Sequence, residues 1–257
     1  DAVGLARRAA ALSWKTCTEF RMPPMLLVGP PGVGKTYFAR KLGSAIGTTV
    51  LEQSMTGADD TILTGHSVSW KGARIGVVAR TLIEGETASP LIFVDEIDKP
   101  QNVGHADLLD PFHSLLEPEN ARAFVDTYLE VPLRADKILW VATANETSHL
   151  KSSLLDRFVV LRIEPPNHDE RCAIINNLYG ITVRAYGSFF DSELSIDVID
   201  ALADDPPRRM RMVIELAMGF AIADRRPSLS TEDIRAARHL AASSVTRQRI
   251  GFHTASL

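Results

Sequence analysis

Residues 25–36 read "MLLVGPPGVGKT", and this stretch decides which fold the sequence predicts. Four apolar residues lead into "GPPGVGKT" (29–36), which matches the pattern G-x-x-x-x-G-K-[ST] in full. A short apolar run that ends in glycines is typical of a buried strand entering a turn, and helical spacing follows over 37–46. We therefore predict a strand, a phosphate-binding loop and a helix. The alternative is a glycine-rich turn that binds no ligand.

The residue types in this loop suit phosphate chemistry. Glycines at 29, 32 and 34 allow the backbone to fold tightly and to direct N–H groups at phosphate oxygens, and the helix N-terminus adds partial positive charge. Lys35 is expected to reach the β- and γ-phosphates of ATP, and Thr36 to ligate Mg²⁺. The residues predicted to line ATP or ADP in this segment are Pro30, Pro31, Gly32, Val33, Gly34, Lys35, Thr36 and Tyr37.

A second stretch, "LIFVDEIDK" (91–99), places two carboxylates at the end of another apolar run. Asp95 and Glu96 would emerge at the carboxyl end of a central strand, where α/β sheets bind ligands. Asp95 is expected to hold Mg²⁺, and Glu96 to polarise a water for attack on the γ-phosphate. The alternative is a pair of carboxylates that are solvated or cap a helix.

The remaining apolar runs complete an α/β pattern. Residues 138–142 and 158–163 form two further strand candidates, 48–51 forms a weaker one, and helical patterns, including one over 5–20, separate the strands. This order predicts a three-layer αβα domain with a parallel five-stranded sheet. After Pro165-Pro166 only helical patterns follow, with capping-box starts at Asn167 with Glu170 and at Ser230 with Asp233. We expect an α/β domain over 1–165 and a small all-helical lid domain over 166–257.

Composition limits the class of protein. The chain has 257 residues, 45% of them apolar, and a net charge of −4, so no overall basic field points to nucleic acid or to a membrane surface. Its two cysteines are isolated, which suits a reducing cytoplasm, and no apolar run is long enough to span a membrane. The histidines at 66, 105, 113, 149 and 168 show no HExxH or Cys-His spacing, so we predict no zinc site.

A phosphate loop, a strand ending in Asp-Glu and a trailing helical domain form the layout of AAA+ ATPases. The chain resembles this superfamily over essentially its whole length. The tracts "LEPENARAFVDTYLEVPLRADKILWVATAN" (116–145) and "LLDRF" (154–158) resemble the ATPase module of Lon proteases in particular. The opening "DAVGL" is similar to the Lon segment that lines the adenine, which implies nucleotide contacts at Val3 and Gly4.

The resemblance also implies three polar roles. Asn145, after the strand "KILWVATAN", corresponds to the sensor-1 residue that orients the attacking water, although Asn also favours turns at strand ends. Arg157 corresponds to the arginine finger that reaches the nucleotide of the adjacent subunit, the alternative being a surface ion pair. Arg208 corresponds to the sensor-2 arginine, with Arg211 as the second choice. A solvated basic patch is the alternative for the "DPPRRMRM" segment (205–212), whose arginines oppose the helix dipole.

The segment "HSVSWKGARIG" (66–76) is polar and glycine-containing, yet it holds a tryptophan. In Lon-type modules this place in the chain is a pore loop, whose aromatic residue grips unfolded polypeptide inside a hexameric ring. The resemblance therefore implies substrate contacts at Trp70 and Lys71, and a second pore loop within 101–107. The alternative is that Trp70 packs back onto its own domain.

Together these observations and the resemblance predict a cytoplasmic ATPase that forms a ring, expected to be a hexamer. Its expected action is chaperone-like: it remodels or threads protein substrates. Nothing in the sequence resembles the Ser-Lys peptidase domain of Lon, so no protease activity is expected from this chain alone. The alternative function is a nucleic-acid-associated AAA+ ATPase of helicase or clamp-loader type, for which Lys71, Arg74 and the arginines of 208–211 are the candidate contacts.

Overall fold

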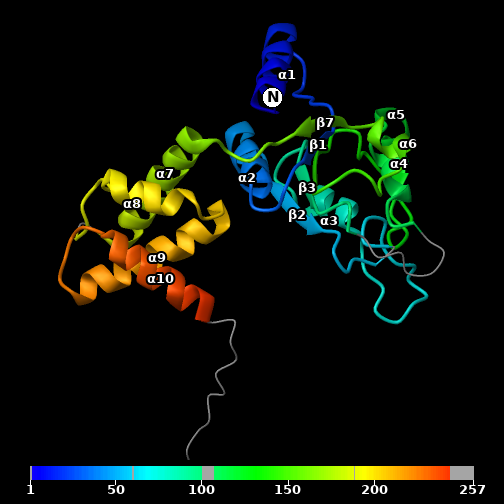
Figure 1. Ribbon diagram of the computed structural model, residues 1–257. Coiled ribbons are helices and arrows are strands. Elements are labelled where there is room, and N and C mark those ends of the chain that lie inside the picture. Colours follow the sequence, from blue (N-terminus) through cyan, green and yellow to red (C-terminus); the bar gives the residue numbers. More distant parts are fainter. Residues whose placement is uncertain (1, 60, 100–106, 188, 244–257) are drawn as a thin grey trace, which may run out of the picture. The chain divides into compact units, whose positions relative to one another are not determined.

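A computed structural model of the chain describes residues 2–59, 61–99, 107–187 and 189–243. The chain divides into two compact units, residues 1–164 and residues 165–257, which Figure 1 shows in the colours of the sequence. Each unit has a hydrophobic core of its own. We describe the two units separately.

A parallel five-stranded sheet forms the centre of the first unit. Its strands lie in the order β2 (Val50–Ser54), β3 (Leu91–Asp95), β6 (Leu139–Ala144), β1 (Met25–Val28) and β7 (Val159–Arg162). The side chains of β1 and β6 are all buried, and so are the first four of β3. The sequence predicted all five strands; β1 matches at both ends, and the other strand ends differ from the observed ones by at most three residues.

The two faces of the sheet carry separate apolar clusters, because successive side chains on a strand point to opposite faces. One cluster contains Leu26, Ile92 and Trp140. The other contains Met25, Phe93 and Val141. The first cluster extends to residues of α3 (Val77–Glu84) and α4 (Asp110–Leu115), and the second to residues of α1 (Ala2–Thr16) and α2 (Lys35–Ile46). The unit is therefore the three-layer αβα arrangement that the sequence predicted.

The same unit contains several short elements that the sequence analysis did not assign. These are the helices α5 (Pro118–Ala121) and α6 (Ser152–Leu155), and an antiparallel pair formed by β4 (Phe124–Val125) and β5 (Pro132–Leu133). They lie in the segments between β3 and β7, and β4 and β5 form a separate two-stranded sheet rather than extend the central one.

The first helix ends earlier than its apolar spacing predicted. Its stripe continues to Phe20, but α1 stops at Thr16 because Cys17 takes a left-handed conformation with φ 51°. The Thr18 N–H then donates to the Ser13 carbonyl, which satisfies one of the last free carbonyls of the helix. Leu12 and Trp14 are exposed, so the apolar stripe faces the core only near the start of α1.

The second unit consists of four helices in its described residues. They are α7 (His168–Tyr186), α8 (Ile196–Ala203), α9 (Pro207–Ala223) and α10 (Thr231–Ser243), and their core includes Tyr179, Leu202 and Ile214. The capping box at Asn167 and Glu170 is confirmed, with both of its hydrogen bonds at 2.9 Å. In the part of the chain that the structure describes, no helix is long and apolar enough to cross a bilayer.

Candidate nucleotide-binding site

The phosphate loop connects the carboxyl end of β1 to the first residue of α2. Gly34 precedes the helix and has a φ of 96°, a left-handed backbone conformation that residues with a Cβ rarely adopt. Within the described parts of the chain no side chain caps this helix start, so its first N–H groups have no side-chain acceptor there. A helix N-terminus with free N–H groups suits a phosphate, because the donors and the partial positive charge both favour an anion.

Lys35 is buried inside this loop rather than extended into solvent, with 8% of its surface exposed. Its ammonium donates to the carbonyls of Gly29 at 2.7 Å and Pro30 at 3.0 Å, and to Oδ1 of Asn145 at 3.2 Å. Burial lowers the pKa of Lys35, and nearby carboxylates, Asp95 first among them, oppose that shift. The lysine thus joins the loop after β1 to the residue that directly follows β6.

Thr143 organises the two acidic residues at the end of β3. Its hydroxyl donates to Oδ1 of Asp95 and accepts from the Glu96 N–H at 3.0 Å, while its carbonyl accepts from the Ile97 N–H at 2.8 Å. Glu96 has φ 55°, a left-handed conformation that is unusual for a residue with a side chain. These contacts hold the backbone turn that directs Asp95 and Glu96 out of the sheet. The sequence analysis did not single out Thr143.

Two further residues fix the polar groups around this turn. The Thr56 hydroxyl donates to Oε2 of Glu96 at 2.8 Å, and Oδ2 of Asp98 accepts from the Asn145 N–H at 3.2 Å. The side chain of Asp98 is fully buried, and its Oδ1 has no hydrogen-bond partner among the described residues. The sequence analysis missed Thr56 and Asp98 as site residues, although Asp98 lies within the quoted 91–99 segment.

The residues of this site fit a magnesium nucleotide. Asp95 and Thr36 offer carboxylate and hydroxyl oxygens, the ligand class that Mg²⁺ prefers, while Lys35 and the start of α2 offer donors for phosphate. The ends of β1, β3 and β6 lie side by side, as the pairs Leu26 with Ala142 and Val94 with Ala142 establish. Parallel strands thus bring together groups that are far apart in the sequence.

Arg157 makes an ion pair within its own chain. Its Nη2 lies 2.5 Å from Oε1 of Glu117, its Nη1 donates to the Ser153 carbonyl, and its Nε is buried without a partner among the described residues. This contact corresponds to the alternative that the sequence left open for Arg157. The predicted contact with an adjacent subunit is not tested by a single chain.

The other predicted nucleotide contacts fall on helices. Val3 is half exposed on α1, and its neighbour Ala2 is buried in the cluster that also contains Ala39 and Leu42 of α2. Tyr37 is exposed in the first turn of α2 with the Lys41 ammonium 5.6 Å from its ring centre. These positions stay predictions.

The helical unit holds the predicted sensor-2 arginine. Pro207 is the first residue of α9, with Pro206 before it at the N-cap, and Arg208 is exposed in the first turn. Arg211 pairs with Glu215 at 3.0 Å, whereas Arg208 has no carboxylate partner in the described part of the chain. This difference favours Arg208 over Arg211 as the arginine available to a ligand.

Trp70 is exposed over 70% of its surface, so it does not pack into the core of its own unit. It lies in a closed loop, because the His66 N–H donates to the Arg74 carbonyl at 3.0 Å and the Trp70 N–H to the Ser67 carbonyl at 3.0 Å. Lys71 is exposed beside it. The predicted second pore loop (101–107) lies outside the described residues except for its last position.

Asp126 anchors the base of this loop, and the sequence analysis missed it. Its carboxylate is completely buried and accepts from the N–H groups of Gly76 at 2.8 Å, Tyr128 at 2.9 Å and Leu129 at 3.1 Å. The bonds from Tyr128 and Leu129 are local, but the Gly76 N–H lies 50 positions away in the sequence, so the sequence gives no signal for the contact that anchors the loop. Its place within the 116–145 tract was the available hint.

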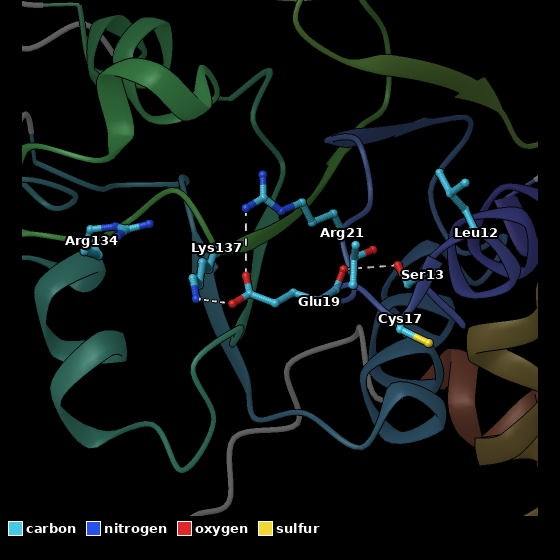
Figure 2. Close-up of a pocket in the computed structure, with 8 residues that line it drawn as sticks. Leu12, Ser13, Cys17, Glu19, Arg21, Arg134 and Lys137 are labelled. Atoms are coloured by element: carbon cyan, nitrogen blue, oxygen red, sulfur yellow. Dashed lines mark hydrogen bonds and ion pairs between the residues drawn. The ribbon is translucent and has the colours of Figure 1, made fainter. Parts of the chain in front are cut away.

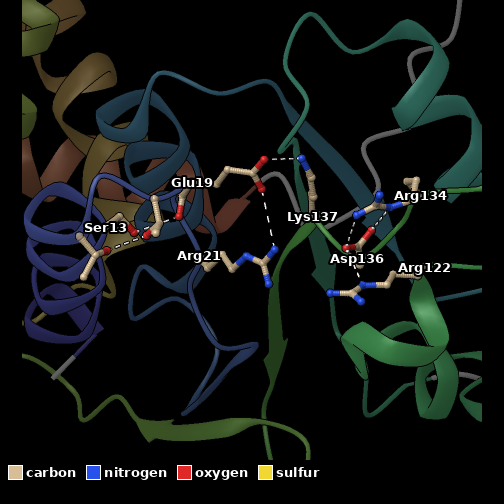
Figure 3. Close-up of polar contacts among 9 residues, drawn as sticks. Ser13, Glu19, Arg21, Arg122, Arg134, Asp136 and Lys137 are labelled. Carbon is tan, nitrogen blue, oxygen red and sulfur yellow. Dashed lines mark hydrogen bonds and ion pairs between the residues drawn. The ribbon is translucent and has the colours of Figure 1, made fainter.

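A separate cavity of about 800 Å³ lies at the opposite edge of the sheet (Figure 2). Arg21 and Lys137, which line it, precede β1 and β6, so the cavity is at the amino ends of these strands and away from the phosphate loop. Figure 3 shows two ion-pair groups there: Glu19 with Lys137 at 2.5 Å and Arg21 at 3.8 Å, and Asp136 with Arg134 and Arg122. The cations that line this cavity are paired with carboxylates and no phosphate-loop residue lines it, so we do not assign the nucleotide to this cavity.

Comparison with known proteins places the chain in a family. Residues 25–165 match the family "ATPase family associated with various cellular activities (AAA)", and the chain belongs to that family. It is 36% identical over 184 residues to a mitochondrial Lon protease homolog of Neurospora crassa, and 35% identical over 158 residues to Lon protease of Brucella suis. The first match covers 69% of this chain and 16% of the relative, and the second covers 61% and 19%.

The chain is thus an AAA+ module of the Lon type, as its sequence indicated, and it spans less than a fifth of these Lon relatives. Among solved structures, the RuvB Holliday junction branch migration motor of Thermotoga maritima superposes with a TM-score of 0.64 at 17% identity. That match covers 91% of this chain and 66% of RuvB, and it supports the AAA+ fold alone. Membership of the family implies nucleotide binding.

Proposed function

We propose that this chain is an ATPase that hydrolyses ATP with Mg²⁺ and uses the reaction to remodel or thread unfolded protein through a ring, most simply a hexamer. The observation that supports this best is the meeting of Lys35, Asp95, Glu96 and Asn145 at neighbouring strand ends, linked by Thr143 and Asp98. No other group of described residues combines a phosphate loop with a carboxylate pair.

Each of these residues has a defined task in the proposal. Lys35 and the first N–H groups of α2 bind the β- and γ-phosphates, and Thr36 with Asp95 holds Mg²⁺. When bound, Mg²⁺ withdraws charge from the phosphate oxygens. Glu96 accepts a proton from the attacking water, and Asn145, whose backbone Asp98 holds, orients that water.

The hydrogen bond from Thr56 affects whether Glu96 is free to accept a proton. In this structure Oε2 of Glu96 accepts the Thr56 hydroxyl at 2.8 Å, so one of its lone pairs is already used. A base must be within hydrogen-bond reach of the proton that it takes. Glu96 can meet this condition with its other oxygen or after a side-chain rotation that releases Thr56.

The assembly part of the proposal concerns Arg157. To act on a neighbouring subunit, its guanidinium has to leave Glu117. Ion pairs near the surface contribute only about 0–1 kcal/mol, so a negatively charged phosphate can replace that carboxylate at little cost. Removal of the Glu117 charge should therefore not impair, and can increase, the transfer of Arg157 to a neighbour's site.

The substrate part of the proposal rests on Trp70. An exposed aromatic face at the tip of a closed loop suits non-specific contact with an extended polypeptide, because the face needs no particular partner side chain. The chain also carries two free cysteines, Cys17 and Cys172, which agrees with our proposal of a reducing, cytoplasmic location. We expect no peptide-bond cleavage by residues 1–257 alone.

Nucleotide binding and turnover by the Glu96→Gln variant test the catalytic assignment. The variant should bind ATP as the wild type does, while its hydrolysis rate falls by ~10²–10⁴, the range typical of a lost positioned base. Lys35→Ala should also lose nucleotide affinity. Glu119→Gln, which changes an exposed carboxylate on α5, is the matched control and should hydrolyse ATP normally. Near-normal turnover by Glu96→Gln would contradict the role given to Glu96.

Stimulation of the ATPase distinguishes the proposed substrate from the alternative. An unfolded protein such as casein should raise the rate for the wild type and for Trp70→Tyr, but much less for Trp70→Ala. Stimulation by duplex DNA that weakens with salt, with no response to casein, would instead support the nucleic-acid alternative. A mixture of Glu96→Gln and Arg157→Ala subunits should regain part of the activity, because some interfaces in mixed rings pair an intact Glu96 with an intact Arg157.

A further inference from the structure

The first turn of α7 and the last turn of α8 bring together three side chains that bind transition metals. His168 and Cys172 are four residues apart and therefore share one face of α7, and Asp200 faces them from α8. Nε2 of His168 lies 3.6 Å from Sγ of Cys172 and 3.7 Å from Oδ1 of Asp200. All three donor atoms lie within 4.8 Å of one another.

The two helices hold this arrangement without help from the three side chains. Arg171 donates to the Ala203 carbonyl at the end of α8 at 2.8 Å and to the Pro166 carbonyl at 3.0 Å. Ile175 and Leu202 belong to the buried core of the same unit. The donor atoms are therefore presented by a packed framework, and a metal ion would not have to fold the site.

Two of the three donor separations are close to those of tetrahedral zinc. Zinc–sulfur bonds of ~2.3 Å and zinc–nitrogen or zinc–oxygen bonds of ~2.0–2.1 Å at a tetrahedral angle put donor atoms about 3.3–3.6 Å apart. The distance from Sγ of Cys172 to Nε2 of His168, 3.6 Å, lies within this range. The distance from Nε2 of His168 to Oδ1 of Asp200, 3.7 Å, is slightly longer, and a small side-chain rotation closes the difference. A thiolate, an imidazole and a carboxylate are the ligand set of zinc rather than of magnesium or calcium.

We propose that His168, Cys172 and Asp200 form a zinc site in the helical unit, with water as the fourth ligand. The ion would tie the first turn of α7 to α8, directly after the Pro165-Pro166 segment where the second unit begins. His168 and Asp200 are exposed, so the ion can enter from solvent and an open position remains. The sequence analysis predicted no zinc site at His168; the proposed site differs from that prediction because its third ligand comes from another helix.

Cobalt binding to the full chain tests the proposal, because Co²⁺ takes the zinc geometry and reports a thiolate ligand through its sulfur-to-cobalt absorption band. Excess Mg²⁺ in the buffer occupies oxygen-ligand sites at the phosphate loop, and a phosphine reductant keeps both thiols reduced. We expect one Co²⁺ per chain with a thiolate band that Zn²⁺ abolishes. Because zinc ligands must lose their protons, the affinity should rise with pH.

Variants assign the ligands. Cys172→Ser should lose the thiolate band, and Asp200→Asn should weaken binding by about ten-fold or more. Two matched controls should bind as the wild type does: Cys17→Ser removes the other cysteine, and His149→Gln removes an exposed histidine that also lies beside a carboxylate, Glu146. Zinc should also raise the melting temperature of the wild type and not that of Asp200→Asn.

Three outcomes would overturn the site. They are a wild-type protein without a thiolate band, a band that survives Cys172→Ser, and affinity unchanged by Asp200→Asn. If Cys172→Ser does not fold, Asp200→Asn still decides, because 57% of the Asp200 side chain is exposed and its replacement disturbs no core. None of these results depends on ATP hydrolysis, so they test the zinc site independently of the proposed function.

Discussion

Replacement of Asp126 should loosen the loop that carries Trp70 while the sheet stays intact. The buried carboxylate accepts three backbone N–H bonds, from Gly76 at the end of that loop and from Tyr128 and Leu129. In Asp126→Ala these three donors lose their acceptor. Because Gly76 is buried, water cannot easily replace the carboxylate there, whereas Tyr128 is exposed and its N–H can be hydrated.

The size of the effect follows from these environments. An unsatisfied buried donor costs about 1–3 kcal/mol, and a hydrated one much less. We therefore expect Asp126→Ala to lower the free energy of unfolding of the first unit by about 3 kcal/mol, most of it from Gly76. For a domain of this size that corresponds to a melting temperature lower by roughly 6–12 °C.

Asp126→Asn keeps the shape of the side chain but removes its charge and one of its two acceptor oxygens. Its single acceptor oxygen can serve Tyr128 and Leu129, but its amide NH₂ then meets the Gly76 N–H, donor against donor. The variant should lose about 2 kcal/mol, less than the alanine variant. Asp156→Asn is the control, since the exposed Asp156 carboxylate accepts no hydrogen bond from the residues that the structure describes, and its replacement should change stability by about 0.5 kcal/mol or less.

Thermal melts and amide hydrogen exchange measure the two sides of this prediction. Melts give the order wild type, Asp126→Asn, Asp126→Ala, and exchange should become faster at Gly76 before it does at core amides of β1 or β6. The reasoning is refuted if Asp126→Ala melts within about 1 °C of the wild type with the Gly76 amide still protected. Equal losses for Asp126→Asn and Asp156→Asn would refute the charge argument alone.

Three further predictions use the same protein. Thr143→Val removes the hydroxyl that joins Asp95 to the backbone of Glu96, so kcat should fall about ten-fold with KM nearly unchanged in steady-state ATPase assays. Trp70→Ala should shift the melting temperature by no more than a few degrees, whereas Trp140→Ala, in the core, should lose about 3–5 kcal/mol. The Arg134 guanidinium lowers the pKa of Asp136 to about 2. The ionised Asp136 carboxylate therefore stabilises the folded state fully above its unfolded-state pKa, and this stabilisation is lost as the pH falls towards 2. Asp136→Asn should remove this part of the acid dependence of stability.

Much of the fold was predictable because local sequence patterns determine its elements. The strand before the phosphate loop, the helix after it and the Asp-Glu strand end are each determined by residues within about ten positions of one another. Helix starts at Asn167 and Pro207 are equally local, since a capping box and a proline at the first helical position act within one turn. Strand ends were less accurate, because pairing with neighbouring strands decides where a strand stops.

The contacts that organise the candidate site were decided only by tertiary structure. Thr143 and Asp98 lie in different strand–loop segments, and their roles exist because β3 and β6 are adjacent and parallel. Likewise, the sequence does not distinguish Asp126 from other polar residues, and its role arises only when folding places it against Gly76.

The same limit explains the zinc ligands and the end of α1. His168 and Cys172 have helical spacing, but Asp200 reaches them only because α8 packs on α7. An apolar stripe likewise continues past Thr16, while the left-handed turn at Cys17 ends the helix. Sequence therefore determined the elements whose stabilising contacts are close along the chain. Three-dimensional packing determined the polar contacts between residues dozens of positions apart, since such pairs leave no periodic pattern to detect.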